Sequence, residues 1–127
     1  MASPDKLSIV FLSGEFGRVH YGLVMAAAAL AIGRPVTLFF TMEGTRALTP
    51  GWADADREEE LRAKGLATFA ELLDACHELD GVFMVCELGL RDCGLTRTDL
   101  RPDIAVGEGS AVTFLSDASD RGAMLMV

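Results

Sequence analysis

Short runs of apolar residues recur along the chain, and polar or glycine-containing segments separate them. Runs of this length, without a polar residue at every second position, are typical of strands that are buried on both faces of a parallel sheet. The pattern therefore predicts strands at residues 7–12, 35–40, 82–85, 103–106 and 123–127.

Helical patterns lie between these strands. A nearly all-apolar helix is expected at 19–32, where Gly33 ends it. A capping box of Thr68 and Glu71 opens a later helix. Further helical segments are predicted at 43–48 and 109–120, and the acidic stretch within 49–65 is expected to be a solvated, mobile flap. The capped helix presents one apolar face, made of Phe69, Leu72, Leu73, Cys76 and Leu79.

Strands that alternate with helices predict an α/β fold, with a parallel sheet covered on both faces, as a single domain over residues 1–127. In such sheets the ligand site lies beyond the carboxyl ends of the strands. That rule selects residues 13–15, 41–43, Cys86 and 107–109.

Composition narrows the choice of partners. The net charge is −8 and no run of Lys or Arg occurs, which argues against nucleic acid and against anionic membrane surfaces. The longest apolar stretch, 21–33, is too short to span a bilayer. Three cysteines cannot all pair within one chain, and no signal peptide is visible, so free thiols in a reducing cytoplasm are expected.

Cys86 is the residue with the most evident chemistry. It ends a strand and begins a short helical stretch, where backbone N–H groups and the helix dipole favour a thiolate. The adjacent Glu87 opposes this if its carboxylate points at the sulfur. A buried inert thiol and a functional thiol are both compatible with the sequence. A helical 87–93 would put Cys93 about 10 Å away, beyond the roughly 7 Å between Cα atoms that a disulfide allows.

No other motif is complete. His20 and His77 lack metal-ligand spacing, so neither a metal nor a cofactor is predicted. His20 opens the first helix, where it is either an acid–base group or a polar first-turn residue. The glycine turns "SGEFG" and "GEG" do not complete a phosphate loop.

Three segments together resemble the DsrE/DsrF-like family, nearest to its peroxiredoxin-like branch. These are the strand, glycine turn and alanine-rich helix from "IVFLSGEFG" to "FFTMEGTRAL", the central "FMVCELGLRDCGL", and the final "GSAVTFLSDASDRGAMLMV". The resemblance implies a three-layer α/β/α, flavodoxin- or Rossmann-like domain with a five-stranded, mainly parallel sheet. It also implies homo-oligomers, often trimers or hexamers, and a strand-ending cysteine, here Cys86, that carries sulfane sulfur as a persulfide to partner proteins. Relatives commonly have Gln and Ser where Glu87 and Gly89 stand.

Two functional hypotheses follow. The first is a sulfur carrier or sulfurtransferase-like protein, with sulfur-donor and acceptor proteins as partners. The second is a non-catalytic oligomeric module that binds a small molecule or a protein and merely packs Cys86. A thiol peroxidase ranks last, because Cys93 is badly placed as a resolving cysteine. The apolar first helix is covered either by another subunit or by the flap. The predicted site consists of Cys86 with Ser13, Gly14, His20, Glu43, Glu87 and Gly107.

Overall fold

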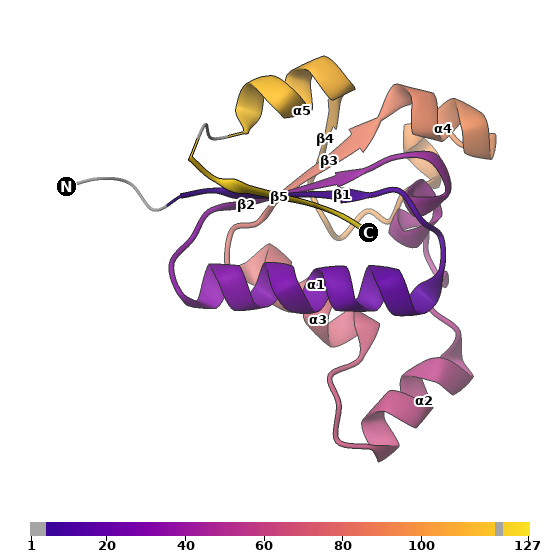
Figure 1. Ribbon diagram of the computed structural model, residues 1–127. Coiled ribbons are helices and arrows are strands. Elements are labelled where there is room, and N and C mark those ends of the chain that lie inside the picture. Colours follow the sequence, from indigo (N-terminus) through magenta and orange to yellow (C-terminus); the bar gives the residue numbers. More distant parts are fainter. Residues whose placement is uncertain (1–4, 119–120) are drawn as a thin grey trace.

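Five strands form one sheet in which every pairing is parallel (Figure 1). The computed structural model describes residues 5–118 and 121–127. The strand order is β4-β3-β2-β1-β5, so the chain steps across the sheet from β1 to β4 and then returns to the far side of β1. The strands are β1 (Leu7–Phe11), β2 (Val36–Phe40), β3 (Val82–Cys86), β4 (Val106–Gly109) and β5 (Ala123–Met126).

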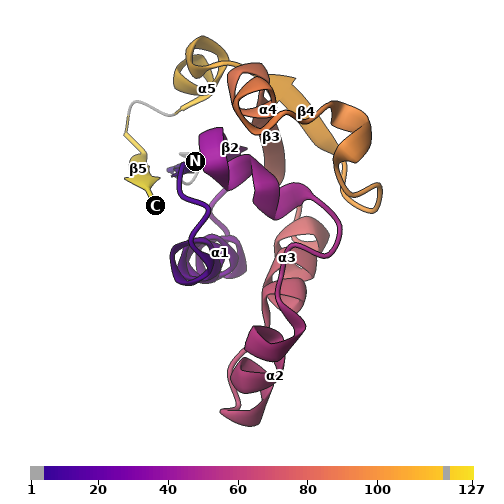
Figure 2. The ribbon, with the colours of Figure 1, turned by 90° about the vertical axis from the view of Figure 1, so that its right-hand side faces the viewer.

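Helices lie on both faces of this sheet, as the α/β prediction requires. Figure 1 shows α1 and α3 together beneath the sheet and α5 above it, whereas α2 projects away from the body of the molecule in both ribbon views (Figures 1 and 2). None of the helices within residues 5–118 and 121–127 has the length and apolar character needed to cross a bilayer. The helical elements are α1 (Phe16–Ala31), η1 (Met42–Leu48), α2 (Ala55–Ala63), α3 (Phe69–Glu78), α4 (Glu87–Cys93), η2 (Arg97–Asp99) and α5 (Ala111–Asp117).

Alternate side chains of the strands enter two separate apolar clusters. The larger one fills the space between the sheet and the α1/α3 layer, where the rings of Phe11 and Phe40 stack at 4.4 Å. The smaller one lies on the α5 face and consists of Val10, Phe39, Cys86 and Phe114, with Met84 packed against it. Cys86 therefore belongs to the smaller of the two clusters, on the α5 face.

Two elements begin three residues away from their predicted starts. Helix α1 begins at Phe16, three residues early, because the Glu15 carboxylate caps it by accepting from the N–H groups of Gly17 and Arg18, both at 2.9 Å. Strand β4 begins at Val106, three residues late. The predicted strand at 103–106 was wrong because Ile104 packs into the core from a loop, while the strand itself has the weak strand-forming sequence VGEG.

The acidic segment, predicted as a solvated, mobile flap, contains the regular helix α2. Asp54 caps α2 by accepting from the N–H of Asp56 at 3.1 Å, and most of the helix faces solvent as expected. Glu58 is the exception, since it is 9% exposed. Its two carboxylate oxygens accept from the N–H groups of Phe69 and Ala70 at 2.8 and 3.0 Å. Helix α2 therefore supplies a second cap for α3.

Helix α3 has the predicted capping box of Thr68 and Glu71. Four residues of its predicted apolar face are buried, but Leu79 is 47% exposed because it follows the last helical turn. Helix α5 ends at Asp117, so the predicted helix over 109–120 is too long at its described end. Residues 119–120 of that prediction lie outside the described residues.

Candidate functional site

Cys86 stands at the carboxyl end of β3 and immediately before α4, as the sequence predicted. Its side chain is 7% exposed and packs with Phe39 and Phe114 on the α5 face of the sheet. The Cα atom of Cys86 is paired in register with that of Gly109 at the end of β4. Cys86 thus lies next to the end of β4, which stands directly before the start of α5.

A cavity of about 460 Å³ opens beside Cys86. The start of α4 forms one wall, and the end of β4 with the first turn of α5 forms the other. Ser110 caps α5 by accepting from the N–H of Thr113 at 3.2 Å, which fixes this second wall. The cavity is lined by Cys86, Glu87, Leu88, Arg91, Glu108, Gly109, Ser110, Ala111 and Thr113.

Each carboxylate on this rim has a cationic partner. Glu87 pairs with Arg91 one turn later on α4, with 2.8 Å between Oε1 and Nη2. Glu108 lies 3.5 Å from the guanidinium of Arg97. Both pairs are exposed, so water screens them strongly. The negative charge that Glu87 brings next to Cys86 is therefore partly offset by Arg91.

Glycine at position 89 has a packing explanation. A Cβ added there would lie 2.5 Å from Thr45 Oγ1 and 2.6 Å from the Met42 nitrogen, which is too close for any real side chain. Helix α4 consequently packs directly on η1, with Gly89 at the contact. This contact helps to hold the start of α4 beside the cavity.

The other predicted residues are not in this cavity. Ser13, Gly14 and Glu43 do come together at the ends of β1 and β2, since a Cβ on Gly14 would lie 3.1 Å from the Glu43 carbonyl oxygen. Ser13 Oγ accepts from the N–H of Glu15 at 3.0 Å. The carboxylate of Glu43 pairs with Arg46 at 2.9 Å.

His20 lies on α1, where its Nε2 is 2.8 Å from the Ala67 carbonyl and its ring stacks on Phe16 at 6.0 Å. It contacts the segment between α2 and α3 and does not line the Cys86 cavity. Gly107 lies inside β4 and lines a different hollow, with Gly81 and Val82 at the start of β3. Of the six residues predicted to line the pocket, only Glu87 lines this cavity.

Leu88, Arg91 and the start of α5 were missed, whereas Glu108 was among the residues selected by the strand-end rule but was not included in the predicted site. Placing the fourth strand three residues early moved its carboxyl end from Gly109 to Val106, so that Gly107 was selected and Ser110 was not. The signal that could have corrected this error is the Ser110–Thr113 pair, a helix N-cap of the kind that follows a strand directly.

The two other cysteines have different surroundings. Cys76 is fully buried in α3, and burial raises the pKa of its thiol to about 12. Burial is also the largest cause of the raised pKa of Cys93, and the carboxylates of Glu43 and Asp92 add to it. The Cys93 thiol donates to the Met42 carbonyl at 3.1 Å. Both thiols are therefore held protonated at neutral pH.

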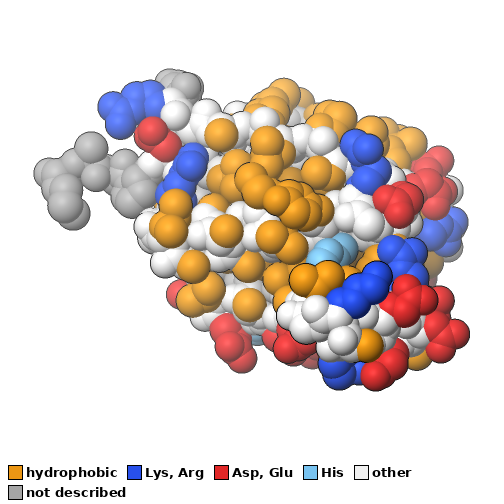
Figure 3. All heavy atoms as spheres, turned by 60° about the horizontal axis from the view of Figure 1, so that its bottom comes forward, with side chains coloured by type: hydrophobic (Ala, Val, Ile, Leu, Met, Phe, Trp, Pro, Cys, Tyr) orange, Lys and Arg blue, Asp and Glu red, His pale blue; other side chains and the backbone are white. Residues whose placement is uncertain are grey.

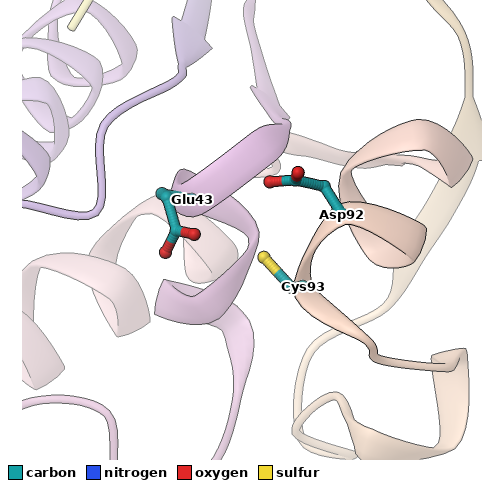
Figure 4. A group of neighbouring side chains, drawn as sticks. All are labelled: Glu43, Asp92 and Cys93. Atoms are coloured by element: carbon teal, nitrogen blue, oxygen red, sulfur yellow. The ribbon is translucent and has the colours of Figure 1, made fainter.

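Glu43, Asp92 and Cys93 bring three metal-ligand atoms within 4.8 Å of one another (Figure 4). They come from η1 and α4, so no spacing in the sequence could reveal the group. Arg46 already supplies a positive charge to Glu43. Asp92 and Glu43 are exposed, and the Cys93 sulfur serves as a donor. We therefore interpret the group as a polar contact between η1 and α4.

The fold and the strand-ending cysteine define a class of small α/β proteins. The chain belongs to the DsrE/DsrF-like family, whose model matches residues 5–126. This family is linked to sulfur relay. The chain is also similar to the ychN protein from E. coli in its crystal structure, with a TM-score of 0.72 and 15% sequence identity. That match covers 97% of this chain and 99% of the other, and it shows the shared fold. No curated protein matches the chain.

Proposed function

We propose that the protein carries sulfane sulfur on Cys86 and passes it to a partner. The observation that carries this proposal is that Cys86 lines an open cavity at the strand ends. All three cysteines are buried, but the surroundings of Cys76 and Cys93 raise the pKa values of their thiols. Membership of a family linked to sulfur relay adds independent support.

The chemistry is a pair of thiol exchange steps. The Cys86 thiolate attacks the outer sulfur of a donor persulfide, R–S–SH, and the S–S bond of the donor breaks. The donor leaves as the thiolate R–S⁻, which takes up a proton from water, and Cys86 becomes Cys–S–SH. An acceptor thiolate then attacks that outer sulfur and releases the Cys86 thiolate. No external oxidant or reductant is consumed in either step.

The walls of the cavity fit such an exchange. The space beside Cys86 is about 460 Å³ and is open to solvent, so a thiol on a protein loop or on a small molecule can enter. Donor and acceptor proteins are therefore the proposed partners, together with further copies of this chain. The relay needs a reduced thiol, so we place it in a reducing compartment such as the cytoplasm.

Mass spectrometry after loading with a persulfide donor tests the proposal. We expect a gain of about 32 Da, the mass of one sulfur, on the peptide that contains Cys86. Cys86→Ser should lose this gain, whereas Cys93→Ser should retain it. Equal loading of the wild type and of Cys86→Ser would contradict the proposal.

A second function is favoured by one specific observation: Cys86 is only 7% exposed and packs against Phe114. A non-catalytic binding module would use the same cavity without any chemistry at the sulfur. It predicts that native Cys86 is alkylated as slowly as Cys76, which serves as an internal standard for a buried thiol. Alkylation of Cys86 at least about 100-fold faster than that of Cys76 would exclude a purely structural thiol.

A further inference from the structure

The outer edge of β5 has unpaired backbone groups. β5 pairs only with β1, and Ala123 and Val127 donate their N–H groups to Lys6 and Val10 at 3.1 and 2.9 Å. Because the hydrogen-bonding direction alternates along a strand, the N–H and C=O groups of Met124 and Met126 point to the other side. No residue of the described chain pairs with them there.

The two edges of the sheet differ in their protection. Along β4, Arg97 donates to the Val106 carbonyl and pairs with the Glu108 carboxylate, so charged side chains line that edge. The sequence of β5 is AMLM and contains no charge and no proline. Met124 and Met126 are 49% and 64% exposed. An apolar edge strand without such protection is a template for pairing with another chain.

The apolar surface continues from β5 onto α1. A Cβ on Gly22 would lie within 3.0 Å of both Phe11 of β1 and Val127, so α1 runs beneath the boundary between β1 and β5. Tyr21 and Met25 on α1, and Ile32 just after its end, are exposed and uncharged. Figure 3 shows hydrophobic side chains gathered over this helix, and carboxylates gathered elsewhere on the same face.

We propose that β5 is an interface between two copies of this chain, paired antiparallel about a two-fold axis with the two Leu125 residues opposite each other. In this register Met124 of each copy exchanges both backbone hydrogen bonds with Met126 of the other. A two-fold axis makes the same patch complementary to itself. The two sheets then form one continuous sheet of ten strands, twice the five strands of each chain.

The position of α1 agrees with this arrangement. Neighbouring strands are about 4.8 Å apart, so two helices beneath the β1/β5 boundaries would be roughly 10 Å apart across the axis. Packed helices are typically about 8–10 Å apart. Pairing of the strands would therefore bring the exposed apolar sides of the two α1 helices into contact.

Charge limits where a second copy of the chain can approach. Each chain has a net charge of −8, so two copies repel wherever their carboxylates meet. The side chains of Met124, Met126, Tyr21, Met25 and Ile32 carry no charge, and Arg18 in the first turn of α1 is an exposed charged residue near them. The interface lies across the sheet from Cys86, and it does not depend on the sulfur chemistry. A two-fold interface joins subunits in pairs and so requires an even number of them. A hexamer can therefore contain this interface, and a simple trimer cannot.

The mass of the protein in solution tests the interface. The chain has a mass of 13.6 kDa, so we expect a species of about 27 kDa (2 × 13.6) or an even multiple of it by sedimentation velocity. The variant Met124→Lys/Met126→Lys places like charges across the axis and should raise the dissociation constant at least about 100-fold. The matched control Leu66→Lys/Val82→Lys adds the same two charges at apolar positions of similar exposure, 52% and 50%, and should associate at least as tightly as the wild type.

Hydrogen exchange of the wild type gives a second readout that does not depend on the folding of a variant. The outward amides of Met124 and Met126 should exchange slowly in the associated protein, and faster on dilution below the dissociation constant. A monomeric or trimeric wild type overturns the proposal. So does an assembly that the two lysines at β5 leave intact, or one in which both amides exchange as freely as in an unpaired strand.

Discussion

At the residue scale, the reactivity of Cys86 depends on a charge balance that the sequence shows only in part. Glu87 stands next to the cysteine in the chain and looked like an obstacle to a thiolate or persulfide anion. The fold adds Arg91, which lies 2.8 Å from the Glu87 carboxylate on the rim of the same cavity. The two residues are four apart on α4, a spacing that brings their side chains together. The pair of Glu87 and Arg91 therefore carries almost no net charge.

Substitutions of Glu87 and of Arg91 should change the alkylation rate of Cys86 in opposite directions. Glu87→Gln removes the negative charge and leaves Arg91 unpaired, so alkylation of Cys86 at neutral pH should become faster by about two- to fivefold, the size of one screened charge at close range. Arg91→Gln should slow alkylation by a similar factor. Rates measured with a neutral alkylating reagent at low salt check this prediction. Changes in the same direction for both variants would mean that packing, and not charge, controls access.

At the element scale, α5 is the part of the molecule that closes the second wall of the cavity. Its end is tied to the sheet by Asp117, whose Oδ2 accepts from Thr37 Oγ1 at 2.7 Å and from Lys6 Nζ at 2.8 Å. Phe114 stacks on Phe39 at 4.9 Å. Burial alone would raise the pKa of Asp117, but the hydrogen bonds from Lys6 and Thr37 outweigh it and lower the pKa below its ordinary value of 3.8.

A lowered carboxyl pKa stabilises the fold above the ordinary value of 3.8 and stops doing so as the pH falls through the folded-state value. We therefore expect Asp117→Asn to lower the free energy of unfolding by about 1 kcal/mol at pH 7. That difference from the wild type should shrink as the pH falls below 3.8. Urea denaturation at several pH values measures it, with Asp56→Asn on the exposed α2 as the control. A difference that does not change with pH would rule out ionised Asp117 as the cause.

Strands and helices were predicted well where a pattern of neighbouring residues determined them. The apolar runs of β1, β2 and β3 and the capping box of α3 each needed only neighbouring residues. Strand β4 has little strand preference of its own, since VGEG is held in the sheet by its pairing with β3. The α2 helix likewise depends on a partner distant in sequence, because Glu58 caps α3 eleven residues later.

The candidate site, too, could be predicted only in part from the sequence. Cys86 was predicted from the rule that places ligands at strand ends, and that rule is independent of sequence distance. The opposite wall, with Ser110 and Thr113, comes from a segment more than twenty residues later, and its place depended on the β4 boundary. His20 was assigned to the site from its position at the helix start, but its ring is held by the Ala67 carbonyl. Contacts of this kind between distant segments leave no pattern in the sequence.

At the scale of the whole molecule, charge and apolar surface are unevenly distributed. Nineteen acidic residues against eleven basic ones give the chain its net charge of −8. The apolar exposed side chains on β5 and α1 lie on the side of the sheet opposite to β4, the strand that contributes to the Cys86 cavity. One edge of the sheet thus carries the proposed chemistry, and the other carries the proposed self-association.

This distribution predicts how association should respond to salt. Two chains of charge −8 repel at long range, while the proposed contact itself contains no ion pair that salt could weaken. The Debye length falls from about 30 Å at 0.01 M salt to about 3 Å at 1 M, so added salt removes the repulsion and leaves the contact unchanged. We expect the dissociation constant to fall by roughly tenfold or more between 0.01 and 0.5 M sodium chloride.

Sedimentation equilibrium across that salt range checks the prediction. Leu66→Lys/Val82→Lys serves as the internal comparison, because its charge of −6, two units above −8, should make its association less dependent on salt than that of the wild type. The opposite trend, in which salt weakens the assembly, would mean that ion pairs hold the subunits together. The contact would then lie on a charged surface such as the rim at Glu87 and Arg91, and the uncharged edge of β5 would not be the interface.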